Sequence, residues 1–103
     1  MNITVSDRAL THLLEAKPTD EAVLRIAAIT EGCGCSADAA FEMNWDYAKP
    51  DDVKVTVSQA LQVVLDRESV QFFGPALWVD WHEAHHAYVL KNKEQIFANH
   101  LML

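Results

Sequence analysis

Residues 38–47 read DAAFEMNWDY, and this stretch gives the clearest indication of the fold class. Apolar residues occupy every second position from Ala39 to Tyr47, and mostly polar residues lie between them. Alternation with a period of two is typical of a β-strand that turns one face toward a core. Residues 38–47 therefore predict a strand.

The segments on either side of this stretch predict further strands. Residues 22–30 (AVLRIAAIT) are almost continuously apolar, as expected of a central strand covered on both faces. A turn at residues 49–52 is followed by alternating valines at 53–57 and by a second apolar run at 61–65. Residues 77–82 and 86–90 predict a hairpin, and Ile3 and Val5 alternate with polar neighbours near the start.

Helical signals are fewer than strand signals. Ser6 is a suitable N-cap, and Leu10, Leu13 and Leu14 share one face of a helix that we expect over Asp7 to Ala16, before Pro18. A short second helix is expected to start at residues 66–69 (DRES) and to end before Gly74-Pro75. The chain thus predicts an α+β fold, compact and β-rich, with mixed or antiparallel strands and with one longer N-terminal and one short helix.

Length and charge narrow the classes of function. The 103 residues suit a single domain, 1–103, and no repeat or linker divides them. A formal net charge of −7 repels phosphate backbones and anionic headgroups, which argues against nucleic acid and membrane surfaces as partners. No signal peptide and no run of membrane-spanning length is visible, so we expect a cytoplasmic protein.

The two cysteines, Cys33 and Cys35, are separated by a single glycine. This spacing differs from the dispersed cysteines of a disulfide-stapled secreted domain and favours a reducing compartment. Thiolates two residues apart in a glycine-rich loop can reach one soft metal ion or cluster. The structural alternatives are a pair of small, partly buried apolar side chains, or a disulfide between these near neighbours that would be strained.

Several motifs, taken in order, resemble the HesB/IscA-like (A-type) iron-sulfur biosynthesis family over nearly the whole chain. They are Gly32-Cys33, Asp66-x-x-Ser69, the triplet Val79-Asp80-Trp81 and the segment Tyr88-Val89-Leu90-Lys91-Asn92. The resemblance implies a compact HesB-like fold that binds iron or an iron-sulfur cluster. It also implies delivery to apoproteins, and homo-oligomers in which chains share the cluster ligands.

The resemblance is incomplete in the C-terminal tail. Members that carry clusters place a Cys-Gly-Cys shortly after the Asn of the last strand, which here falls on about Asn99, His100 and Leu101. Only Cys33 therefore matches a family ligand, and Cys35 is an additional thiol. His100, or a histidine of the 82–86 segment, could supply a nitrogen ligand in place of the missing thiols, since imidazole binds iron and zinc.

Residues 82–86 (HEAHH) contain an H-E-x-x-H pattern, in which two histidines bind zinc and the glutamate activates water. That mechanism needs a helix, because only there do His82 and His86 share a face. The upstream Gly74-Pro75 and the Val, Trp and Tyr residues around the motif favour a hairpin instead. We therefore expect exposed histidines in a turn, and a zinc hydrolase is the third alternative.

The sequence predicts a non-enzymatic iron-sulfur biogenesis protein that binds iron or a cluster through Cys33 and Cys35, with His100 as a weaker metal candidate. Its expected partners are assembly proteins or apoprotein clients. Trp78 and Trp81 fall on opposite faces of one strand, so one of them could face another subunit, which suggests a homodimer. The second alternative is a fold relative that has lost cluster binding and acts as a protein-interaction module.

Overall fold

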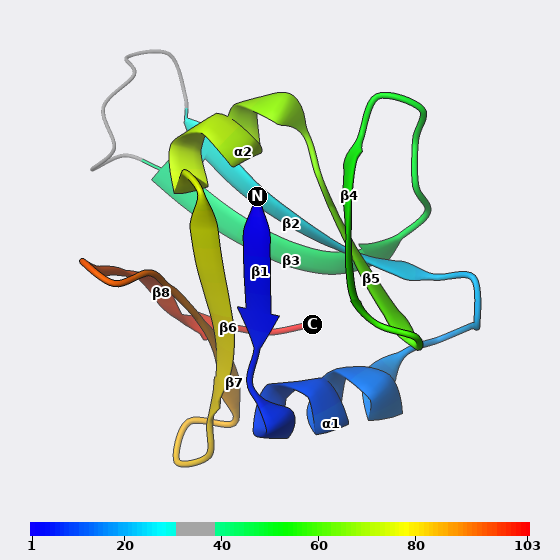
Figure 1. Ribbon diagram of the computed structural model, residues 1–103. Coiled ribbons are helices and arrows are strands. Elements are labelled where there is room, and N and C mark those ends of the chain that lie inside the picture. Colours follow the sequence, from blue (N-terminus) through cyan, green and yellow to red (C-terminus); the bar gives the residue numbers. More distant parts are fainter. Residues whose placement is uncertain (31–38) are drawn as a thin grey trace.

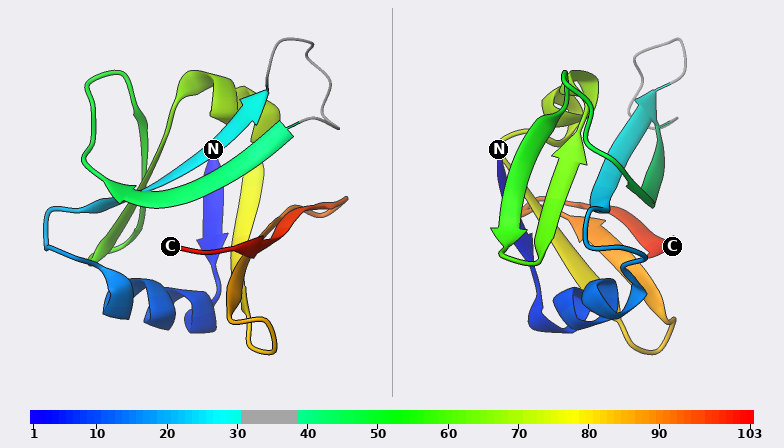
Figure 2. Two further views of the ribbon diagram at one scale, coloured as in Figure 1. Left: turned by 180° about the vertical axis from the view of Figure 1, so that it is seen from behind. Right: turned by 90° about the vertical axis from the view of Figure 1, so that its right-hand side faces the viewer.

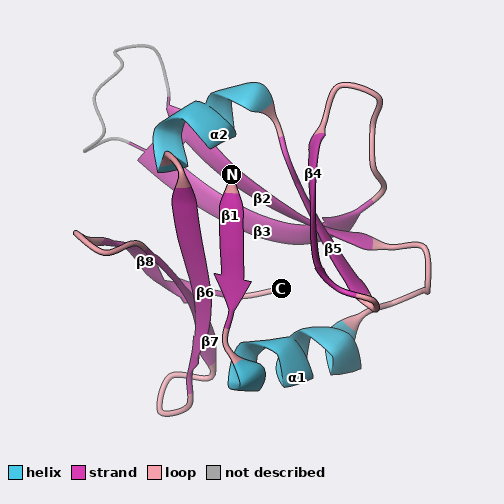
Figure 3. Ribbon diagram, viewed as in Figure 1, coloured by secondary structure: helices cyan, strands magenta, loops and turns pink. Residues whose placement is uncertain are grey.

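The computed structural model describes residues 1–30 and 39–103, and strands dominate them (Figures 1 and 3). Its helices are α1 (Asp7–Ala16) and α2 (Arg67–Phe73). Its strands are β1 (Asn2–Val5), β2 (Val23–Thr30), β3 (Ala39–Asp46), β4 (Val53–Ser58), β5 (Leu61–Leu65), β6 (Ala76–His82), β7 (Ala87–Lys91) and β8 (Ile96–Leu101). The predicted α+β class, with a longer N-terminal helix and a short second one, is confirmed.

The strands form two four-stranded mixed sheets, with the orders β1-β6-β7-β8 and β3-β2-β5-β4. In the first sheet β1 runs parallel to β6, while β6, β7 and β8 are antiparallel neighbours. In the second, β2 pairs antiparallel with β3 and briefly parallel with β5, which pairs antiparallel with β4. The predicted hairpin of β6 and β7 is therefore present, and β2 is an inner strand.

The two faces of β2 are covered differently, which corrects one expectation. Leu24, Ile26 and Ala28 lie in the core, but on the opposite face Ile29 is 37 % exposed. Arg25 on that face is covered by ion pairs rather than by apolar residues. The apolar run of residues 22–30 therefore does not mean that both faces of β2 lie against apolar residues.

The core contains apolar side chains from both sheets and both helices. Its fully buried members include Leu13 of α1, Leu24 and Ile26 of β2, and Leu77 and Leu90 of the first sheet. The two helices lie at opposite ends of the molecule, with α1 beside the tip of the β6–β7 hairpin (Figures 1 and 2). Neither helix of the described residues has the length and apolar character needed to cross a membrane.

An ion-pair network joins β2 to the chain that leaves β3. The Arg25 guanidinium donates to both carboxylate oxygens of Asp52, at 3.0 and 2.6 Å, and its Nε donates to Asp46 Oδ2 at 2.7 Å. The Asp52 side chain is only 6 % exposed. The hydrogen bonds from Arg25 hold the pKa of Asp52 down at about 2, against an ordinary 3.8.

Strand β8 was not predicted from the sequence. Its pairing with β7 shifts register twice, between Tyr88 and Leu90 and between Leu90 and Lys91. Such irregularities interrupt the alternation of inward and outward side chains on which strand prediction depends. The residues after Asn92 form a turn followed by β8, which is the edge strand of the first sheet.

Candidate functional site

The predicted ligands Cys33 and Cys35 lie outside the described residues, in the connection between β2 and β3. The structure describes the two ends of that connection, in β2 and β3, and we call these paired ends its base. Ala28 is paired with Phe41, and Ile29 with Ala40, in the β2–β3 ladder. The ligand role of the two thiols therefore stays a prediction.

The Asp-x-x-Ser motif supports this base through α2. Asp66 caps the helix, since its Oδ1 accepts the Ser69 N–H at 2.7 Å. Ser69 is completely buried, and its Oγ accepts the backbone N–H of Ala28 at 3.0 Å. Because the β2–β5 pairing covers only Leu24 and Arg25, this hydroxyl takes the place of a strand partner further along β2.

Four phenylalanine side chains join β3, α2 and β8 close to the same base. The ring centroids of Phe41 and Phe97 are 5.9 Å apart, and those of Phe73 and Phe97 are 5.2 Å apart. Phe72 completes the cluster, 5.7 Å from Phe41. The start of β8 is thereby held beside the first residues of β3.

The tail positions lie further along β8 and do not point to one common site. Leu101 pairs with Tyr88 and packs on the periphery of the core, while Asn99 is exposed. The His100 ring stacks on His85 at a centroid distance of 4.4 Å. Asn99 Oδ1 lies 3.2 Å from His100 Nδ1. The structure thus brings His100 to the hairpin histidines.

The H-E-x-x-H residues form the tip of the β6–β7 hairpin, as predicted. His82 ends β6, and the backbone N–H groups of His85 and His86 donate to the carbonyls of His82 and Glu83. His82 stacks on His85 at 4.3 Å, whereas the His86 ring lies beside Trp81 at 6.3 Å. The two motif histidines therefore face different neighbours, which removes the helical basis of the zinc hydrolase hypothesis.

The imidazoles of His82, His85 and His100 form a stack on the surface, which we call the histidine stack. Partial desolvation of the exposed His85 ring by its neighbours, together with electrostatic repulsion from His82 and His100, lowers the pKa of His85. Stacked rings present their faces, rather than converging nitrogens, to one another. In residues 1–30 and 39–103, no group of three or more His, Cys, Asp or Glu side chains could hold a metal ion.

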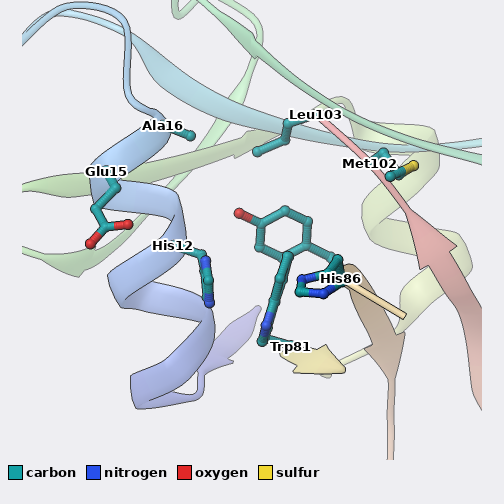
Figure 4. Close-up of a pocket in the computed structure, with 8 residues that line it drawn as sticks. His12, Glu15, Ala16, Trp81, His86, Met102 and Leu103 are labelled. Atoms are coloured by element: carbon teal, nitrogen blue, oxygen red, sulfur yellow. The ribbon is translucent and has the colours of Figure 1, made fainter. Parts of the chain in front are cut away.

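A pocket of about 370 Å³ lies between α1 and the hairpin (Figure 4). Its lining residues are His12, Glu15, Ala16, Trp81, His86, Tyr88, Met102 and Leu103. The pocket was not predicted from the sequence, because it joins α1 to hairpin and C-terminal residues that are distant along the chain. The sequence signal was Trp81 of the Val79-Asp80-Trp81 triplet, whose ring stacks on His12 at 3.9 Å.

The remaining motif residues of the resemblance have structural roles. Asp80 Oδ1 accepts from Ser6 Oγ at 2.7 Å and from the Trp81 N–H at 2.8 Å, and Lys91 Nζ donates to its Oδ2 at 3.3 Å. These hydrogen bonds, led by that from Ser6, lower the pKa of Asp80. Asn92 Oδ1 accepts two backbone N–H groups in the turn before β8.

Comparison with solved structures finds the same fold in three bacterial proteins. A Lactobacillus salivarius protein provisionally assigned to Fe-S biosynthesis is 18% identical, with a TM-score of 0.72 over 98% of this chain and 94% of its own. A Lactobacillus acidophilus protein with the same assignment is 20% identical, with a TM-score of 0.68 over 98% and 86%. Escherichia coli SufA, involved in biosynthesis of iron-sulfur clusters, is 15% identical, with a TM-score of 0.68 over 91% and 82%.

At these identities the structural matches show the shared fold alone. Among curated proteins, none matches the sequence. The sequence itself matches the family model described as iron-sulphur cluster biosynthesis over residues 1–103. This match covers every motif that carried the resemblance, including the Gly-Cys position. The chain therefore belongs to the iron-sulphur cluster biosynthesis family.

Proposed function

We propose that this protein binds iron or an iron-sulfur cluster through Cys33, assisted by Cys35, and takes part in cluster assembly or delivery without enzymatic activity. The observation that carries the proposal is the family match over residues 1–103, which includes the Gly32-Cys33 position. The partners are assembly proteins or apoprotein clients. Because the chain has two closely spaced cysteines and no dispersed set, the reducing cytoplasm is the compartment that we propose.

The framework around the loop supports this proposal. Ser69 fixes Ala28 on one side of the connection, and the phenylalanine cluster fixes Phe41 on the other. A ligand loop anchored at both ends on a packed scaffold loses less conformational freedom when it binds a metal. The buried contacts of Ser69 and of the phenylalanine cluster thus support both ends of the connection that carries the thiols.

The number of thiols couples cluster binding to association. One chain offers two cysteines, whereas the common iron-sulfur clusters are usually held by four ligands. Two copies of Cys33 and Cys35 across a two-fold axis supply that number, so the cluster-bound form is a homodimer. Asn99 and Leu101 offer no thiols, and His100 is stacked on His85, so the loop provides the main ligands.

Anaerobic reconstitution with iron and sulfide tests the proposal. The wild type is expected to gain visible charge-transfer absorption, bound iron and acid-labile sulfide, and to shift toward dimer on size exclusion. Cys33→Ser is expected to lose all of these, and Cys35→Ser to lose less if a histidine substitutes. His100→Ala is the matched test of that substitution, because the side chain is exposed and its removal spares the core.

Two results would count against cluster binding. One is a wild type that takes up no iron, and the other is equal uptake in the Cys33→Ser variant. Either result favours the second function, a protein-interaction module that keeps the fold but not the cluster. The missing thiols at positions 99 and 101 are the observation that gives this alternative its weight.

A further inference from the structure

The pocket between α1 and the hairpin has aromatic walls. His12 stacks on Trp81, with ring planes 23° apart and centroids 3.9 Å apart. Tyr88 meets Trp81 edge-on at 4.9 Å, and His86 approaches the same indole at 6.3 Å. In Figure 4 the Trp81 ring lies between His12, which comes from α1, and His86, which comes from the hairpin turn. His12 and Trp81 each cover one face of the other, so a ligand meets only the aromatic surface that remains toward the pocket. Aromatic rings attract organic cations through the ring quadrupole.

The charges around this aromatic pocket have one sign. Glu15 lines it, and no lysine or arginine does. Glu83 Oε2 accepts a hydrogen bond from Trp81 Nε1 at 2.6 Å and lies 3.9 Å from His12 Nε2. The Glu83 carboxylate, by accepting this hydrogen bond, fixes the orientation of the Trp81 ring and increases the electron density of the indole. Together with the net charge of −7, these groups favour a cationic ligand.

The hydroxyl of Tyr88 provides a further observation. Tyr88 lines the pocket although it is only 5 % exposed. Burial raises the pKa of this hydroxyl. Among the described residues the fully buried side-chain polar atom without a partner is Trp45 Nε1, so the Tyr88 oxygen keeps access to the pocket. A ligand in the pocket that donates an N–H group would hydrogen-bond to this oxygen.

We propose that this aromatic pocket binds an arginine side chain of a partner protein. A planar guanidinium stacks on aromatic rings and has donors to spare for Tyr88 and Glu15, whereas an ammonium is a compact, strongly hydrated charge. Met102 and Leu103 line the same pocket and are 70% and 46% exposed. These side chains offer contacts to apolar residues beside the arginine, which a free guanidinium compound would not use.

Nuclear magnetic resonance titrations of the full chain test this at pH 8, where imidazoles are generally uncharged. The probes are a tripeptide with arginine between two leucines, the same peptide with neutral citrulline, and acetyl-arginine amide. The arginine tripeptide is expected to give saturable shifts of the Trp81 indole and the His86 ring. The citrulline peptide is expected to give none, and acetyl-arginine amide to bind several-fold more weakly.

Variants locate the binding and separate it from folding. Glu15→Gln is expected to weaken the arginine tripeptide about two- to fivefold, as for an exposed ion pair. The matched control Glu21→Gln, exposed and outside this pocket, should leave binding unchanged. Trp81→Leu should abolish binding, and a retained dispersed spectrum shows that the variant is folded. Equal binding of arginine and citrulline, equal binding of acetyl-arginine amide, or no effect of Glu15→Gln would overturn the proposal.

Discussion

The residues that resemble the family and the residues that depart from it occupy different environments. Asp66, Ser69 and Asp80 are hydrogen-bonded framework residues, and Ser69 is completely buried. The departures at positions 99–101 and the histidines at 82–86 are on or near the surface, on an edge strand and a hairpin tip. The framework residues stabilise the fold. The surface residues contribute less to stability and can therefore differ from the family pattern in this chain.

This difference explains how a chain can match the family throughout and still lack the tail thiols. Exchanging a surface residue on an edge strand costs little folding free energy, whereas exchanging a buried hydrogen-bond partner costs much more. The comparison predicts that framework variants lose stability. It also predicts that variants of the histidine stack change titration behaviour with little loss of stability.

The largest expected effect is that of Ser69→Ala. Removing the hydroxyl leaves the Ala28 N–H without its buried acceptor, which costs about 1–3 kcal/mol of unfolding free energy. Urea unfolding followed by circular dichroism measures this loss. Ser58→Ala is the control, because Ser58 Oγ accepts the Ala60 N–H in an exposed turn and its loss should cost under about 0.5 kcal/mol. Equal losses in both variants would remove the distinction between framework and surface.

An intermediate effect is expected for Asp52→Asn at neutral pH. The folded-state pKa of Asp52 is about 2, below the ordinary 3.8, so its ion pair with Arg25 stabilises the fold above about pH 4. That contribution, about 1–2 kcal/mol, is lost as the pH falls from 3.8 toward 2. The stability difference between wild type and variant should therefore shrink over this range in urea unfolding.

A neighbouring carboxylate provides the control for this pH dependence. Asp51 is exposed in the same turn, so Asp51→Asn should change the unfolding free energy by less than about 0.5 kcal/mol at pH 7. If Asp52→Asn and Asp51→Asn were equally mild, the Arg25 network would not be part of the stabilising framework.

Much of the fold could be predicted because local patterns agreed with the tertiary contacts. Ser6 and Asp66 act as the N-caps expected of them, and the alternation in residues 38–47 matches strand β3. Strand β8 escaped prediction because its register shifts break the alternation. The covering of Arg25 also escaped, because Asp52 reaches it from a turn that is distant along the chain.

The candidate site was less predictable than the fold. The Cys33-Gly34-Cys35 spacing suggests thiolate ligands by itself, but the aromatic pocket joins His12 to Trp81, which no local pattern connects. The histidine stack likewise joins a hairpin tip to an unpredicted strand. Sites assembled from distant segments need the fold before their chemistry can be seen.

The smallest expected effect concerns the histidine stack. The pKa of His85 is lowered because the neighbouring rings partly desolvate its exposed imidazole and because His82 and His100 lie close enough to repel its positive charge. In the unfolded chain His85 binds its proton more readily, so its contribution opposes folding as the pH falls below the ordinary value of 6.5. His85→Asn should therefore reduce the loss of thermal stability between pH 8 and about pH 5.5. His100→Asn keeps His85 but removes one neighbour, and the His85 ring resonance should then titrate at a higher pH. A His85 titration that does not move in His100→Asn would show that the two rings are not coupled, and the surface region would then lack the property that distinguishes it from the framework.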